Sequence, residues 1–133
     1  MKLSFSTRGW TDLGWEDMIA TALDMGFAGI EVYNLPKFRN LQDKGSPFHK
    51  YNTAATARQL KEKKLAIPCF DTPCDLSQDT DAVEKLSALM EVAHNTQVPY
   101  VVACALTDNE EQVAENLEKL VALGAELDVT VLL

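Results

Sequence analysis

Three side chains suited to binding a hydroxylated small molecule stand at or just after short apolar runs of the sequence. Trp10 follows the first run, Tyr33 ends the second, and Asp71 ends the third. A carboxylate accepts hydrogen bonds from hydroxyl groups, and an indole or phenol ring offers an apolar face to a ligand. If these runs are neighbouring parallel strands, their ends lie at one edge of a sheet, where such a ligand would bind.

Each of these side chains also has a purely structural interpretation. Asp71 can stabilise an Asx turn in the bend before Pro73. Trp10 can pack on the helical segment that begins at Trp15. The sequence leaves both interpretations open beside the binding role.

Glu31 lies inside the second apolar run, between Ile30 and Val32. Alternation along a strand turns these two apolar side chains toward covering helices and places Glu31 on the opposite face. A carboxylate there needs partners or shifts its pKa. We expect Ser4 or Ser6, on the preceding run, to bind it in a structural network, and the functional alternative is a contact with substrate.

Short strand-like runs alternate with longer helical ones along the whole chain. The runs start at positions 3, 29, 66, 100 and 129, so successive starts are 26 to 37 residues apart. That spacing is typical of β-α units, and the unbroken apolar run 100–105 fits a parallel strand covered on both faces. The pattern predicts one domain over residues 1–133, with four β-α units and a fifth strand in an α/β fold.

The helical segments have apolar residues at helical spacing, and two of them carry start signals. Asp81 with Glu84, and Asp108 with Glu111, have the spacing of a capping box. We therefore expect these two aspartates to cap the third and fourth helices.

Eight β-α units require about 250 residues, so this chain supplies roughly half of a (β/α)₈ barrel. It ends inside the apolar run 129–133, with no turn or covering helix after it. We expect an N-terminal half-barrel whose open edges favour a homo-oligomer of the isolated chain. Five such units also describe a small flavodoxin-like binding domain, and the pattern alone leaves that alternative open.

Composition narrows the classes of function. The formal net charge of -8 disfavours a nucleic-acid partner, and no apolar run is long enough to span a membrane. The odd number of cysteines, Cys69, Cys74 and Cys104, suits reduced thiols in the cytoplasm. Their spacing, with His49 and His94, does not predict a zinc site.

The longest irregular stretch, from Asn34 to Asn52, is locally basic in an acidic chain. Long loops inside compact domains are usually functional or mobile. It can be a lid that attracts an anionic or hydroxylated substrate, or a solvated loop with aromatic anchors. The residues behind these two interpretations are Lys37, Phe38, Arg39, Lys44, Phe48, His49, Lys50 and Tyr51.

The segments 15–18 (Trp-Glu-Asp-Met) and 22–32 (Ala-Leu-Asp-Met-Gly-Phe-Ala-Gly-Ile-Glu-Val) resemble the opening of the xylose-isomerase-like barrel family. In that family a helix, a Gly-Phe turn and a Gly-Ile-Glu strand follow one another. The family includes sugar-phosphate isomerases, ketose 3-epimerases and inosose dehydratases. The resemblance implies a TIM barrel parent that is a metal-dependent sugar or sugar-phosphate isomerase or epimerase.

The resemblance further implies a divalent metal in the full-length parent, Mn²⁺, Mg²⁺ or Zn²⁺, held at the ends of strands five to eight. The first ligand, a Glu, would follow directly after 130–133, so we expect no metal site and no catalytic residue in this chain. The expected roles that remain are sugar contacts by Trp10, Glu31, Tyr33 and Asp71, in a fragment inactive alone. A non-catalytic half-barrel assembly unit is the alternative.

Overall fold

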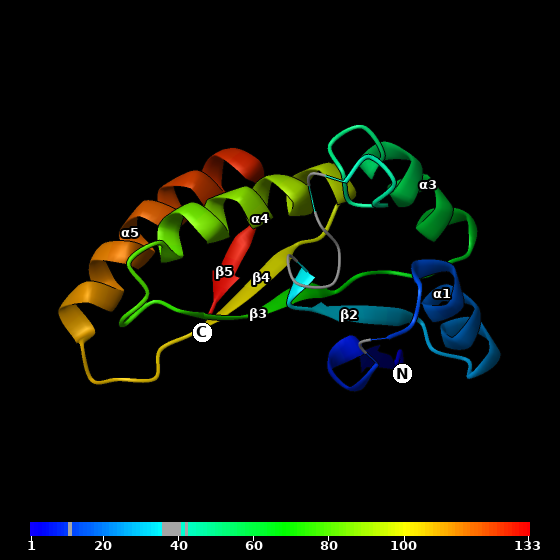
Figure 1. Cartoon of the computed structure of the whole chain (residues 1–133), viewed down its shortest axis with the longest axis horizontal. Coiled ribbons are helices and arrows are strands. Elements are labelled where there is room, and N and C mark those ends of the chain that lie inside the picture. Colours follow the sequence, from blue (N-terminus) through cyan, green and yellow to red (C-terminus); the bar gives the residue numbers. More distant parts are fainter. Residues whose placement is uncertain (11, 36–40, 42) are drawn as a thin grey trace.

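The computed structural model describes residues 1–10, 12–35, 41 and 43–133. Strands and helices alternate along these residues as the sequence predicts (Figure 1). The elements are β1 (Ser4–Ser6), the 3₁₀ turn η1 (Thr7–Gly9), α1 (Trp15–Asp24), β2 (Gly29–Tyr33), α3 (Thr53–Glu62), β3 (Cys69–Asp75), α4 (Ala82–Thr96), β4 (Tyr100–Cys104), α5 (Glu110–Leu127) and β5 (Thr130–Leu132).

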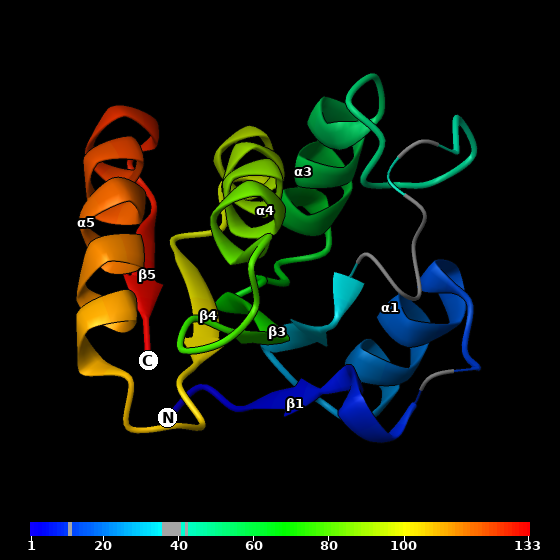
Figure 2. The same cartoon turned by 60° about the vertical axis from the view of Figure 1, so that its left-hand side comes forward.

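The strands form one open, parallel, five-stranded sheet in the order β1-β2-β3-β4-β5. Each strand pairs with the next one in sequence, which is the winding of a (β/α)₈ barrel. A flavodoxin-like sheet has the order 2-1-3-4-5, so that alternative is wrong. The helices α3, α4 and α5 lie side by side along one face of the sheet (Figures 1 and 2).

The hydrophobic core lies between the sheet and its helices. Ile30, Val32, Phe70 and Val101 are almost fully buried on the helix side of the strands. Residues that alternate with them, such as Glu31, are only half-buried because the other face of the sheet is open. The alternation expected for β2 is therefore confirmed.

The inner face of the sheet is mixed in character. Its β1–β3 part carries Ser6, Glu31 and Asp71, whereas Tyr100 of β4 and Leu132 of β5 are exposed. The exposed large apolar side chains of this face thus lie on its last two strands.

The third strand starts later and ends later than expected. β3 begins at Cys69, and Ala66 makes only an isolated bridge to Gly29. The ladder is interrupted between Ala66 and Cys69 because Pro68 lacks a backbone donor. Beyond Asp71 the pairing with β4 shifts register before it resumes at Asp75. This β-bulge carries β3 past the end of β2 and level with the end of β4, on the side where a barrel binds its ligands.

Both predicted capping boxes are wrong. Asp81 precedes α4 but makes no side-chain cap; its carboxylate forms an ion pair with Lys85, 2.9 Å away. The cap of α5 is Asn109, whose side-chain oxygen accepts a hydrogen bond from the Gln112 amide. The Asn109 amide oxygen takes over the function expected of Asp108 because the helix starts one residue later.

The aromatic anchors of the loop before α3 are confirmed in part. Phe48 is 1% exposed and packs edge-on against Trp15 and Phe70, and His49 is also buried, whereas Tyr51 is exposed. Lys37, Phe38 and Arg39, which the lid interpretation needs, lie outside the described residues. Within the described part of the chain, no helix is long and apolar enough to cross a membrane.

Candidate functional site

Arg8, in the turn after β1, contacts the last residue of β2 and a residue inside β3. Its Nη2 atom donates to Oδ2 of Asp71 at 2.8 Å, and its guanidinium carbon lies 4.3 Å from the centre of the Tyr33 ring. The Arg8 side chain is 63% exposed and the Asp71 side chain 16%. Tyr33 and Asp71 are direct register partners of β2 and β3, so two of the predicted contact residues do come together.

Hydrogen bonds from two backbone amides fix the positions of these residues. The buried Thr7 hydroxyl accepts a hydrogen bond from the Tyr33 amide at 2.9 Å, which ties η1 to β2. The Asn34 amide donates to the Asp71 carbonyl at 2.7 Å, with Asn34 in a left-handed conformation at φ 49°. Because β2 is held on both sides, Arg8 and Asp71 are presented at a defined separation.

Glu31 has a partner other than the predicted one. Its Oε2 atom lies 3.8 Å from the Cys69 sulfur on β3, where the thiol can donate a weak hydrogen bond. The hydrogen bond found at the Ser6 hydroxyl is instead one that it accepts from the Arg8 amide, as the cap of η1. Ser4 packs over Gly29, where a side chain would collide with the Ser4 hydroxyl. The expected serine network is therefore replaced by a carboxylate–thiol pair.

The Cys69 thiol is held in its neutral form. Burial, together with the carboxylates of Glu31 and Asp71, raises its pKa to about 11. Between these two carboxylates, Cys69 serves as a weak donor on the inner face and is not a nucleophile at neutral pH.

Trp10 lies beside the Arg8–Tyr33–Asp71 cluster and takes no part in the Arg8–Asp71 ion pair. Its ring packs on Phe5, with 4.8 Å between ring centres. Together with Tyr33 and Trp15 it lines a very small cavity, so the packing interpretation of Trp10 is supported. Trp10 as a whole is half-buried.

A buried carboxylate that sequence reasoning missed lies at the end of β3. Asp75 is 3% exposed and accepts hydrogen bonds from the Ser77 hydroxyl and amide, the Gln78 side chain and the Leu106 amide. These donors, the Ser77 hydroxyl foremost, lower the pKa of Asp75 to about 2. The spacing of Asp75 and Ser77 is that of an Asx turn, which was the available sequence signal.

The Asp75 network joins two loops on the same edge of the sheet. The Ser77 hydroxyl accepts from the Thr107 amide at 3.1 Å, and the Asn109 side chain donates to the Ser77 carbonyl. Asn116 of α5 donates to the Leu76 carbonyl at 2.9 Å. The loops after β3 and β4 therefore form one preorganised unit next to the Arg8 cluster.

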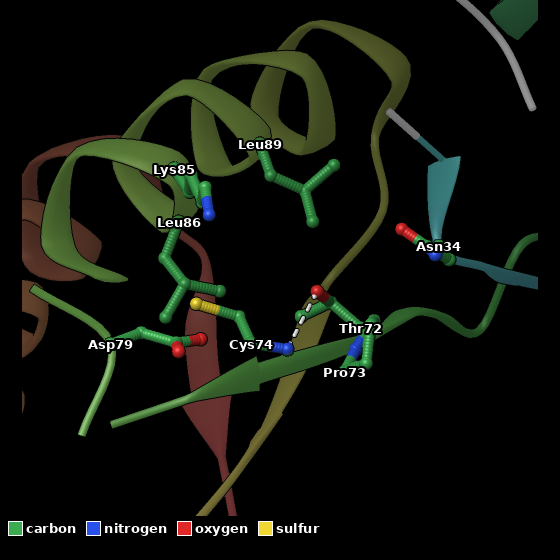
Figure 3. Close-up of a pocket in the computed structure, with 8 residues that line it drawn as sticks. All are labelled: Asn34, Thr72, Pro73, Cys74, Asp79, Lys85, Leu86 and Leu89. Carbon is green, nitrogen blue, oxygen red and sulfur yellow. Dashed lines mark hydrogen bonds between the residues drawn. The ribbon is translucent and has the colours of Figure 1, made fainter. Parts of the chain in front are cut away.

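A cavity of about 210 Å³ lies on the helix side of the bulge, between β3 and α4 (Figure 3). Figure 3 shows Thr72 and Cys74 of β3 facing Leu86 and Leu89 of α4. The other residues that line the cavity are Asn34, Pro73, Asp79 and Lys85. Burial raises the pKa of Cys74 to about 11, so this cavity offers a neutral thiol and a few hydrogen-bonding groups.

The described residues do not fit a bound metal ion. Over residues 1–10, 12–35, 41 and 43–133, no group of three or more His, Cys, Asp or Glu side chains is placed to hold one. The Glu31–Cys69 pair provides a single carboxylate and a thiol that stays protonated.

Comparisons with solved structures match the chain to barrels of one kind. It is similar to the probable 3-DHS dehydratase AsbF of Bacillus anthracis, with 22% identity and a TM-score of 0.70 over 100% of this chain and 52% of that one. It is also similar to the IOLI protein with a binding zinc atom, with 16% identity and a TM-score of 0.74 over 98% of this chain and 50% of that one. The comparison with D-psicose 3-epimerase of Clostridium cellulolyticum H10 gives 13% identity and a TM-score of 0.74, over 98% of this chain and 51% of that one.

The chain thus has the fold of the N-terminal half of a xylose isomerase-like TIM barrel, and it spans about half the length of the proteins it matches. Neither protein-family models nor curated proteins give a match. At these identities the likeness defines the fold, and the expectation of a half-barrel is confirmed.

Proposed function

We propose that this chain is the N-terminal half of a metal-dependent sugar or sugar-phosphate isomerase or epimerase, acting in the cytoplasm, and that its strand ends contact the sugar. The observation that carries the proposal is the Arg8–Tyr33–Asp71 cluster, which lies where β1 and β2 end and where the bulge of β3 begins. In parallel barrels the ligand binds at this edge of the sheet.

The chemistry of the cluster suits a polyol. A sugar hydroxyl both donates and accepts, and the ion pair offers guanidinium donors beside a carboxylate acceptor. Arg8 keeps most of its surface open, so its remaining N–H groups are available to a ligand. We assign Tyr33 and Asp71 to direct contact with the sugar, Glu31 to a deeper contact on the inner face, and Trp10 to an apolar edge of the site.

Catalysis is assigned to residues outside this chain. Because the described side chains do not fit a divalent metal, the role proposed for them is confined to binding the sugar. The chain alone is proposed to be inactive. Support for a metal in the complete protein comes from a matched structure that is described with a binding zinc atom.

A non-catalytic assembly unit is the second candidate. The open outer edges of β1 and β5 favour it, because the five described strands end the sheet on both sides. In that case the isolated chain forms a homo-oligomer and has no affinity for sugars.

Saturation-transfer NMR with D-tagatose tests the proposed sugar contact. We expect transfer to the sugar from the wild-type chain, and a loss of at least about half of it in Asp71→Asn, since an amide cannot hold Arg8 by charge. The matched control is Asp81→Asn, which breaks an exposed ion pair on α4. Equal transfer from wild type and Asp71→Asn would contradict the sugar site, and no transfer from any variant would favour the assembly unit.

A further inference from the structure

Four residues form a row across the inner face of the sheet at its ligand-binding edge. They are Tyr33, Asp71, Val102 and Leu132, each the register partner of the next. Each alternates along its strand with a residue that faces the helices, so the four side chains share the open face. Arg8 extends the row on the β1 side, through its contacts with Tyr33 and Asp71.

The β2–β3 part of this face is acidic. Glu31 and Asp71 bring two negative charges to it and Arg8 brings one positive charge, which leaves a net charge of -1. The Arg8 charge is paired with Asp71, whereas Glu31 takes part in none of the ion pairs among the described residues. The five strands contain no Lys or Arg that could balance it.

The Cys69 thiol shows the effect of these carboxylates on a neighbouring anion. Its sulfur lies 3.8 Å from Oε2 of Glu31. Burial, together with the negative charges of Glu31 and Asp71, raises the pKa of Cys69 to about 11, so a negatively charged thiolate is disfavoured at this position. The same two carboxylates oppose the negative charge of a ligand bound beside them.

The β4–β5 part of the row gives an anion no compensation. Val102 and Leu132 are aliphatic, and Leu132 is 41% exposed. A charged group placed over aliphatic side chains loses water and gains no hydrogen-bond partner. The C–H groups of a sugar ring, in contrast, pack favourably on such side chains.

We propose that this half of the site binds an uncharged polyol and discriminates against a sugar that carries a phosphate or carboxylate group. The inference rests on the proposed sugar contact and narrows its ligand class to unphosphorylated sugars. Sugar hydroxyl groups donate to Glu31 and Asp71 and accept from Arg8, so an uncharged ligand satisfies the polar groups of this face. Glu31 is the specificity-determining residue, because its charge is the one left without a described counter-ion.

Two ligands that differ by one phosphate group test this inference. Dissociation constants of D-fructose and D-fructose 6-phosphate are measured at low salt from the amide chemical shifts of residues 33–34 and 71–72. We expect D-fructose to bind the wild-type chain at least about tenfold more tightly than the phosphate. Glu31→Gln keeps the shape of the side chain and removes its charge, and it should reduce this ratio by at least about threefold.

The matched control is Glu91→Gln, which removes one negative charge from the exposed face of α4, on the other side of the sheet. We expect it to leave the ratio of the two dissociation constants unchanged. Circular dichroism checks the folding of both variants. If Glu31→Gln unfolds, the wild-type ratio is measured again at high salt, where screening should reduce it.

Several results would overturn the inference while the sugar contact stands. They are equal or tighter binding of the phosphate, an equal effect of Glu31→Gln and Glu91→Gln on the ratio, and a ratio that neither Glu31→Gln nor salt alters. Binding of neither ligand would overturn the proposed sugar contact, and this inference with it.

Discussion

The Arg8 guanidinium reaches across the end of β2 to the Asp71 carboxylate, 2.8 Å away, with the Tyr33 ring beneath it. One contact therefore links three successive strands through two residues, Arg8 and Asp71, that are 63 positions apart in the sequence. The pair is too exposed to add more than about 1 kcal/mol to stability. Its position at the ligand-binding edge of the sheet, more than its energy, makes it the centre of the candidate site.

Asp75 should control the stability of the fold in acid. Its pKa is lowered from 3.8 to about 2, so its contribution is complete above pH 4 and is lost as the pH falls from about 4 to about 2. Asp75→Asn should lower the melting temperature at pH 7 by several degrees and flatten its fall below pH 4. Thermal melts followed by circular dichroism measure both effects.

Asp81→Asn is the control for that experiment, because Asp81 pairs with Lys85 on the surface of α4. The pKa of Asp81 is also lowered, chiefly by its hydrogen bond from Lys85. If Asp81→Asn and Asp75→Asn change the acid transition equally, the central role of Asp75 is wrong.

Cys69 should resist alkylation in the folded chain and respond to Glu31. Burial and the nearby Glu31 raise its pKa to about 11, so almost no thiolate exists at pH 8. Glu31→Gln removes the negative charge and should speed the reaction of Cys69 with iodoacetamide, as measured by mass spectrometry. Cys74, whose pKa is raised mainly by burial, is the internal reference and should not change. An unchanged Cys69 rate in Glu31→Gln would contradict the carboxylate–thiol pair.

Phe48 should act as a core residue although it lies in the loop before α3. It is 1% exposed and packs against Trp15 and Phe70, so Phe48→Ala should cost about 3 to 5 kcal/mol of unfolding free energy. Tyr51→Ala, at a side chain that is 74% exposed, should change the unfolding free energy by less than about 0.5 kcal/mol. Urea denaturation compares the two, and a Phe48→Ala variant as stable as the wild type would restore the view of Phe48 as a lid residue.

The isolated chain should neither bind a divalent metal stoichiometrically nor epimerise sugars. The described side chains place no suitable group of ligands together, and the proposed catalytic residues belong to another half of the barrel. Calorimetric titration with Mn²⁺, Mg²⁺ and Zn²⁺ should give only weak binding without defined stoichiometry. Tight binding of one ion with conversion of D-fructose would show that the active site lies in this chain.

The alternation of strands and helices and the parallel sheet could be predicted from the sequence because the signals were local and repeated, whereas the order of the strands was left open. Apolar runs such as 100–105 and helical spacing in α5 set the period of the β-α units, and that period fixes a parallel sheet. The boundaries were less accurate. Asp81 and Asp108 matched a capping pattern, but an ion pair and a later helix start changed their roles.

The site was predictable as a set of strand-end residues and not as a set of contacts. Tyr33 and Asp71 were identified because they end apolar runs, yet their pairing depends on the register of β2 and β3. The partner of Glu31, and the hydrogen bond that links Asp75 to Leu106, involve residues 30 or more positions apart. Such contacts follow from the bulge in β3 and the loops it positions, which no local pattern encodes.

The most direct test of the half-barrel account maps where a sugar binds. Amide chemical shifts of the isotope-labelled chain are recorded during titration with D-fructose. We expect the largest shifts at residues 7–10, 33–34 and 71–72, around the Arg8–Tyr33–Asp71 cluster, and their loss in Arg8→Gln but not in Arg58→Gln. Shifts confined to the opposite ends of the strands, or a response unaffected by Arg8→Gln, would contradict the account.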